Sequence, residues 1–108
     1  MVLKIDTTKR DEVKVWLIDS STKLKDRLAV KQLGSQVLLP IIIKILKKNK
    51  KSLSDIDEIE VETGPGSFTG TRVGVSVANA LGFALNIPVN NKKGKIVVPV
   101  YQQSKFDQ

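Results

Sequence analysis

The 108-residue chain contains no cysteine and no histidine, and only 5% of its residues are aromatic. Without cysteine, a disulfide framework, a thiolate nucleophile and a sulfur-ligated metal site are all excluded. Without histidine, the chain lacks the usual general base at neutral pH and the commonest metal ligand. The groups left for chemistry are 11 acidic residues, 18 basic residues and scattered hydroxyls. The composition therefore favours a protein that is not an enzyme and binds no metal or cofactor.

Charged residues are missing from the stretch 73–91. Asn79, Asn86 and Pro88 interrupt its hydrophobic character, which leaves an apolar helix of about 15 residues, whereas a membrane span needs about 20. The N-terminus meets its first charge at Lys4, which is too early for a signal peptide. We therefore expect a cytoplasmic protein that makes no contact with a membrane.

The formal net charge is +7, and lysines cluster at 44–51 and again in 92–108. Such clusters complement a helix macrodipole or aid solubility, and they also attract RNA or another polyanion. Charge alone does not decide between these interpretations. A chain of this length forms one domain. We expect a lobe at 1–91 and a basic C-terminal extension at 92–108, for which an edge strand is one alternative.

The first third of the chain predicts strands. The segments 2–5, 13–18 and 24–31 are short. In the second, Val13, Val15 and Leu17 occupy alternate positions, and in the third, Leu24, Leu28 and Val30 alternate with basic residues, as in strands. Turn-prone residues occupy 6–11 and 19–22. Three consecutive strands joined by short turns predict an antiparallel meander.

The rest of the chain alternates helix and strand. A helix is expected at 36–48, a strand at 56–63, a second helix at 68–85 and a short closing strand at 87–89. This order implies parallel strands joined by crossover helices. Behind a three-strand antiparallel meander, it predicts a single α/β lobe of the actin-like ATPase, or ribonuclease-H-like, kind.

The first helix carries more apolar surface than one sheet can cover. One face would be formed by Leu38, Ile41, Ile42, Ile45 and Leu46, which follow helical spacing. Large apolar residues also lie off that face, at Val37, Leu39 and Ile43. The surplus indicates an interface with another surface.

The run Gly-Pro-Gly-Ser-Phe-Thr-Gly-Thr-Arg-Val-Gly at 64–74 lies where a strand passes into a helix. A phosphate-binding P-loop would need a lysine directly after Gly70, where Thr71 stands. A dinucleotide site would need an acidic residue about 20 positions further on, but none occurs between Glu62 and Asp107. Neither nucleotide interpretation is favoured.

The remaining interpretation is close packing. Gly70, Gly74, Ala78 and Gly82 recur every four residues and form a narrow stripe on the second helix. Each glycine inside a helix costs about 1 kcal/mol relative to alanine, which the close approach of another backbone can offset. The neighbour is either the chain's own sheet and first helix or another chain. The surplus apolar face of the first helix favours another chain.

Five segments, taken in order and spacing, resemble the N-terminal lobe of the TsaB family, also called YeaZ or the Gcp-like glycoprotease homologue. They lie at 2–8, 35–40, 52–57, 64–74 and 87–89, and the glycine-rich run is the most specific. The resemblance implies an actin-like ATPase fold. In that family TsaB is a non-catalytic partner of TsaD, which binds metal and ATP and transfers the threonylcarbamoyl group to adenosine in certain tRNAs. An ATPase, TsaE, joins them.

The resemblance implies that this chain is a non-catalytic scaffold subunit of the tRNA threonylcarbamoyladenosine-forming complex. It would bind a TsaD-like subunit through its two helices, with a TsaE-like ATPase as a further partner, and meet tRNA only through the complex. The expected partner interface comprises Leu39, Ile43, Gly70, Gly74, Val77, Ala78 and Leu81. The expected glycine-rich turn comprises Gly64, Pro65, Gly66, Ser67, Thr69 and Arg72.

Two alternatives belong to other classes. Family members usually carry a second lobe, which this sequence does not include, and an actin-like nucleotide site lies between two lobes. ATP binding at 6–8 is therefore not expected. One alternative is an actin-like ATP-dependent transferase or peptidase remnant that would use Asp6 or Asp57. The other is a self-associating module that forms homodimers through the same two helices.

Overall fold

A computed structural model describes residues 1–31 and 35–100 of the chain. Its elements are the strands β1 (Val2–Asp6), β2 (Val13–Asp19) and β3 (Leu24–Val30), the helix α1 (Ser35–Lys48), the 3-10 turn η1 (Leu53–Asp55), the strand β4 (Glu58–Val61) and the helix α2 (Phe68–Leu85). Both predicted helices are present, and the bounds of α2 agree with the prediction. The strand predicted at 56–63 is shorter at both ends.

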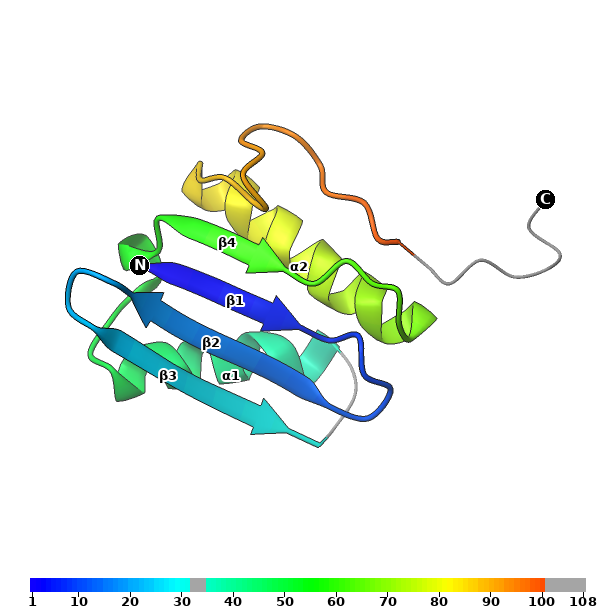
Figure 1. The fold of residues 1–108 in the computed structure, drawn as a ribbon, viewed down its shortest axis with the longest axis horizontal. Helices are drawn as coiled ribbons and strands as arrows, with labels where there is room; N and C mark the ends of the chain where they lie inside the picture. Colours follow the sequence, from blue (N-terminus) through cyan, green and yellow to red (C-terminus); the bar gives the residue numbers. More distant parts are fainter. Residues whose placement is uncertain (32–34, 101–108) are drawn as a thin grey trace, which may run out of the picture.

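The four strands form one mixed sheet in the order β3-β2-β1-β4 (Figure 1). β2 is antiparallel to both β1 and β3, whereas β4 is parallel to β1, with Leu3 opposite Leu17 on one side and Ile59 on the other. A parallel neighbour requires a crossover connection, and α1 makes it between β3 and β4. The predicted meander followed by a parallel strand is confirmed, as is the single α/β lobe with two helices.

The predicted closing strand at 87–89 is reduced to a single parallel bridge between Ile59 and Val89. The amide of Ile59 donates to the carbonyl of Pro88 at 3.0 Å, and the amide of Asn90 donates to the carbonyl of Ile59 at 2.9 Å. Asn90 and Asn91 then adopt positive φ angles of 50° and 66°, a conformation that asparagine tolerates. This pair reverses the chain before a longer strand can form.

Both helices lie on one face of the sheet and enclose a single hydrophobic core (Figure 1). The core takes Leu3 and Ile5 from β1, Val13, Val15 and Leu17 from β2, Ile59 and Val61 from β4, Leu38, Ile41, Ile42, Ile45 and Leu46 from α1, Val75 and Ala78 from α2, and also Ile56, Val89 and Val97. The other sheet face carries charged residues beside the half-buried Trp16, among them the ion pair of Lys4 and Glu60 at 3.7 Å. Within the described ranges, neither helix is long and apolar enough to cross a membrane.

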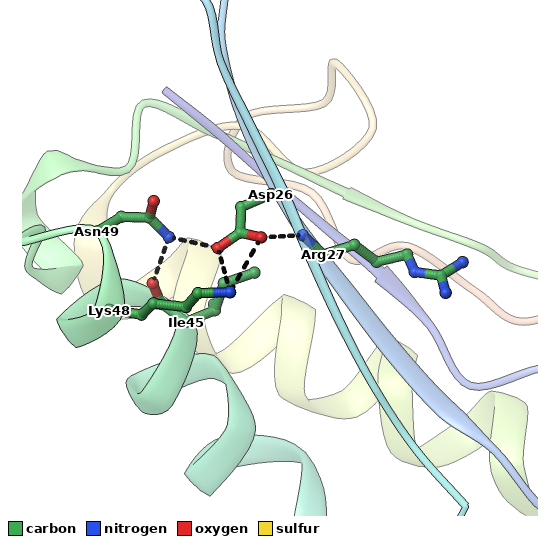
Figure 2. A network of polar contacts seen from close by, with 5 residues as sticks. All are labelled: Asp26, Arg27, Ile45, Lys48 and Asn49. Atoms are coloured by element: carbon green, nitrogen blue, oxygen red, sulfur yellow. Dashed lines mark hydrogen bonds and ion pairs between the residues drawn. The ribbon is translucent and has the colours of Figure 1, made fainter.

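A polar network joins the end of α1 to β3 (Figure 2). The carboxylate of Asp26 accepts hydrogen bonds from the side-chain amide of Asn49 at 2.9 Å and from the backbone amide of Arg27 at 2.8 Å. The ammonium of Lys48 lies 3.3 Å from the same carboxylate. The pKa of Asp26 is lowered mainly by the hydrogen bond from Asn49, and further by those from Arg27 and Lys48. The network therefore ties the end of α1 to β3.

The segment after the Asn90–Asn91 turn runs back beside α2 (orange in Figure 1). Lys92 forms one antiparallel bridge with Val89, and Val97 packs into the core with 7% of its surface exposed. Among residues 92–100 none belongs to a strand of the sheet, so the edge-strand alternative does not hold for this part of the extension. Residues 101–108 of the predicted extension lie outside the described residues. The predicted boundary at residue 91 stays a prediction.

Candidate functional site

The glycine-rich turn wraps around the end of β1. The amide of Ser67 donates to the carbonyl of Thr8 at 2.7 Å, and a Cβ added at Gly66 would lie 2.7 Å from that oxygen. The Gly64–Pro65 peptide bond is cis. Ser67 is the N-cap of α2, and its hydroxyl accepts from the amide of Gly70 at 3.3 Å. The turn thus presses its backbone against Thr8, just after β1, and glycine is needed at Gly66 because a side chain would collide there.

Thr7 connects the end of β1 to the first turns of α2. Its side chain is 1% exposed, its hydroxyl donates to the carbonyl of Gly70, and the same oxygen accepts from the amide of Gly74 at 3.1 Å. A Cβ at Gly70 would collide with the carbonyl oxygen of Thr7, and a Cβ at Gly74 would collide with its hydroxyl oxygen. Sequence analysis missed this role of Thr7, because nothing local marks a contact between residues so far apart in the chain.

The stripe of small residues on α2 therefore faces the chain's own sheet. Gly70, Gly74 and Ala78 are buried, and Gly82 lies against Val89. This corrects the expectation that Gly70, Gly74 and Ala78 contact a partner. The carbonyl of Thr7 lies against Gly70, the side chains of Thr7 and Ile5 lie against Gly74, and Ala78 is fully buried. The penalty of glycine in a helix is offset inside the fold.

The other expected interface residues are Leu39 and Ile43 of α1 and Val77 and Leu81 of α2. Together with Val73 of α2, we call them the helix seam. The two helices contact each other. Leu39 is 44% exposed, and the other four are half-buried. A shallow depression beside the seam is lined by Thr69, Arg72, Val73, Ser76 and Val77. The periodicity of α2 that predicts Val77 also applies to Val73, four residues earlier, which sequence analysis left out.

The exposed part of the glycine-rich run borders this seam. Pro65, Gly66, Thr69 and Arg72 are exposed, and the guanidinium of Arg72 lies 5.5 Å from the ring centre of Phe68. The ring and the cation attract each other at this distance, which holds Arg72 over the first turn of α2. The first turn therefore presents a cation and a threonine hydroxyl next to an apolar strip.

The two carboxylates considered for catalysis have structural contacts. Asp6 accepts hydrogen bonds from the amide and the hydroxyl of Thr8, at 2.9 Å and 2.6 Å, which form the turn after β1. Asp57 pairs with the terminal amine of Met1. Within residues 1–31 and 35–100, no group of three acidic side chains lies close enough to hold a metal ion. The geometry of the seam suits the binding of an apolar surface.

Known proteins resemble this chain in both sequence and fold. A family model described as TsaD: tRNA N6-adenosine threonylcarbamoyltransferase matches residues 29–91, more than half of the chain. The solved structure of YeaZ from Pseudomonas aeruginosa is similar over 93% of the chain, with a TM-score of 0.75 and 30% sequence identity. The tRNA threonylcarbamoyladenosine biosynthesis protein TsaB of Escherichia coli (strain K12) is 34% identical over 82% of the chain. The chain belongs to the TsaB (YeaZ) group of this family.

Relatives in the family include proteins named as enzymes. The tRNA N6-adenosine threonylcarbamoyltransferase of Nitrosomonas eutropha is 43% identical over half of this chain. The chain spans only part of these relatives: 38% of the Escherichia coli TsaB, 42% of the Pseudomonas aeruginosa YeaZ and 16% of the Nitrosomonas eutropha transferase. The match to the TsaB group includes both helices of the seam and the glycine-rich turn.

Proposed function

We propose that this chain is a non-catalytic scaffold subunit in the formation of tRNA threonylcarbamoyladenosine. It binds a TsaD-like catalytic subunit through the helix seam. The observation that carries the proposal is the exposure of Leu39, together with the half-buried Ile43 and Val77 on the same two helices, in a chain whose relatives in the TsaB group are named for this biosynthesis.

The apolar character of the seam supports a protein partner. Covering apolar surface is worth about 25 cal/mol per Å², so a leucine that is almost half exposed has free energy to gain from a partner. Leu39 follows directly after the buried Leu38 and precedes Pro40, which is exposed as well. A partner that packs on this part of α1 would also reach Val73 and Val77, because α1 and α2 contact each other.

The chemistry of the chain supports a role without catalysis. The sequence has neither histidine nor cysteine. Its best-placed carboxylate, Asp6, is engaged in the turn after β1, and Asp57 is paired with the terminal amine. A TsaD-like partner would supply the metal, the nucleotide and the transfer step, and this chain would supply a binding surface.

The test is co-purification of the full chain with a TsaD-like protein from the same genome. Leu39→Lys places a charge at the seam and is expected to weaken the complex at least about tenfold, because truncating or charging a central apolar contact costs about 2 kcal/mol or more. Ala29→Lys, at an exposed position of β3 outside the seam, serves as the control and leaves the complex intact.

Equal recovery of the wild-type and Leu39→Lys complexes would refute the seam as the binding surface. Light scattering of the chain alone tests the self-associating alternative. The seam would be assigned to a second copy of the chain if the wild type forms a dimer, Leu39→Lys dissociates it, and a TsaD-like protein does not compete with it. Tight magnesium-dependent binding of ATP to the isolated chain would instead favour the transferase or peptidase remnant.

A further inference from the structure

A second exposed apolar surface lies on the flank of α2 away from the seam. Among the described residues, every exposed large hydrophobic side chain other than Leu39 belongs to α2 or to the segment 96–100. Phe83 is 91% exposed, Ile96 78% and Val98 67%. We call the surface formed by these three residues the outer flank. Exposed apolar side chains that gather in this way mark interaction sites more often than scattered ones do.

The outer flank is held in place by hydrogen bonds with α2 and with Thr63. The side chain of Asn79 accepts from the amide of Val97 at 3.0 Å and donates to the carbonyl of Val97 at 2.8 Å. The amide of Val100 donates to the carbonyl of Thr63. Since Val97 points into the core and neighbouring side chains in an extended chain point to opposite sides, Ile96 and Val98 are fixed facing outward.

A cavity of about 280 Å³ opens within this surface. It is lined by Asn79, Gly82, Phe83, Asn86, Ile87, Val89, Lys92, Gly94, Lys95 and Ile96. Pockets for whole small molecules are about 300–1,000 Å³ and enclose most of the ligand. A cavity of this size at the surface suits one or two large side chains of a peptide.

The cavity is lined by two lysines, Lys92 and Lys95, and by no acidic residue. The sequence has no acidic residue from 63 to 100, and its basic residues there are Arg72, Lys92, Lys93 and Lys95. None of the three lysines forms an ion pair with a described residue. A second copy of this chain would bring like charges together at this surface, whereas an acidic partner would be attracted.

We propose that the outer flank binds an acidic peptide segment of another protein through an apolar anchor. A leucine-like or phenylalanine-like side chain enters the cavity beside Phe83 and Ile96, and carboxylates next to it pair with Lys92 and Lys95. Single-stranded nucleic acid is the other polyanion that binds basic surfaces, but it uses aromatic stacking along a basic groove. Here the exposed row is mainly aliphatic, which favours a peptide. This surface is separate from the helix seam and does not depend on the proposed function.

The test uses a fluorescent peptide that alternates glutamate with leucine, titrated with the full chain and followed by fluorescence anisotropy. Saturable binding is expected. Ile96→Ser and Phe83→Ser should each weaken it about tenfold, as removal of a central anchor does. The double change Lys92→Glu and Lys95→Glu should weaken it most at low salt. Leu39→Ser, at the seam, is the matched control and leaves the affinity unchanged.

Two results would overturn the proposal. One is unchanged affinity in Ile96→Ser and Phe83→Ser, whose exposed positions leave the fold intact, as far-UV circular dichroism would confirm. The other is displacement of the peptide by a thymidine oligonucleotide whose binding requires the lysines but not Ile96. That result would make the surface a nucleic-acid site. If the Leu39→Lys variant still binds the peptide but no longer binds the TsaD-like partner, the outer flank and the helix seam act independently. Failure of the proposed function can then be told apart from failure of this proposal.

Discussion

Replacing Gly74 by alanine adds one methyl group at the point where α2 lies against the end of β1. The added carbon would collide with the hydroxyl oxygen of Thr7 and would lie 3.4 Å from a methyl group of Ile5. Thr7 cannot rotate away without losing its hydrogen bonds to the carbonyl of Gly70 and the amide of Gly74. The cost of the change should therefore depend on whether Thr7 is present.

The magnitude follows from the contacts. Two hydrogen bonds at about 1 kcal/mol each are lost if Thr7 moves, and overpacking adds about 1–2 kcal/mol. The preference of a helix for alanine over glycine returns about 1 kcal/mol. Gly74→Ala should lower the free energy of unfolding by about 2–3 kcal/mol. In a Thr7→Ala background the colliding atoms are absent, and the same change should raise it by up to about 1 kcal/mol.

Urea denaturation followed by far-UV circular dichroism measures all four proteins of this double-mutant cycle. The expected coupling energy is about 3 kcal/mol. Ser76→Ala, on the exposed face of the same helix, serves as a control for helix propensity and should change stability by less than about 0.5 kcal/mol. If Gly74→Ala has the same effect with and without Thr7, the explanation of the glycine stripe as a contact with β1 fails.

Three other predictions test single features. The hydroxyl of Thr71 is buried without a hydrogen-bond partner among the described residues, so Thr71→Val should be neutral or stabilise the fold by about 1 kcal/mol in urea denaturation, and a clear loss would reveal a hidden partner. The pKa of Asp26 is lowered in the fold, so the ionised carboxylate stabilises the fold fully above the ordinary aspartate pKa near 4, and this stabilisation is lost as the pH falls below that value. Asp26→Asn should therefore make the free energy of unfolding less dependent on pH in the acid range. An unchanged pH dependence would contradict this. Asn90→Gly keeps the positive φ but removes the side-chain hydrogen bonds to Val61, so thermal unfolding should show a loss of about 2 kcal/mol, and wild-type stability would refute the role of the amide.

Local patterns made much of the fold predictable. Alternation identified the meander, and the bounds of α2 follow from its flanking residues, since Ser67 caps its start and Asn86, with φ at 56°, ends it. The exposed Leu39 was also predictable, because it lies off the apolar face of α1. Each of these features depends on residues close in sequence.

Contacts between distant residues could not be predicted in the same way. The spacing of Gly70 and Gly74 indicated that another element packs closely on α2, but only the fold identifies Thr7 as the neighbour. The anchoring of Val97 by Asn79 joins residues on either side of a chain reversal, so the outer flank left no local signal. The same holds for the side chain of Asn90, whose partner lies in β4.

The turn after α2 has a consequence for how copies of this protein can associate through their sheets. The outward-facing backbone groups of β4 are occupied: Ile59 bonds to Pro88 and Asn90, and Val61 bonds to the side-chain amide of Asn90 at 2.8 Å and 3.0 Å. A side chain therefore takes the place of the next strand and closes this edge to β-augmentation. Strand addition would have to begin at β3, the other end of the sheet, where the exposed Lys25 and Arg27 repel an identical strand.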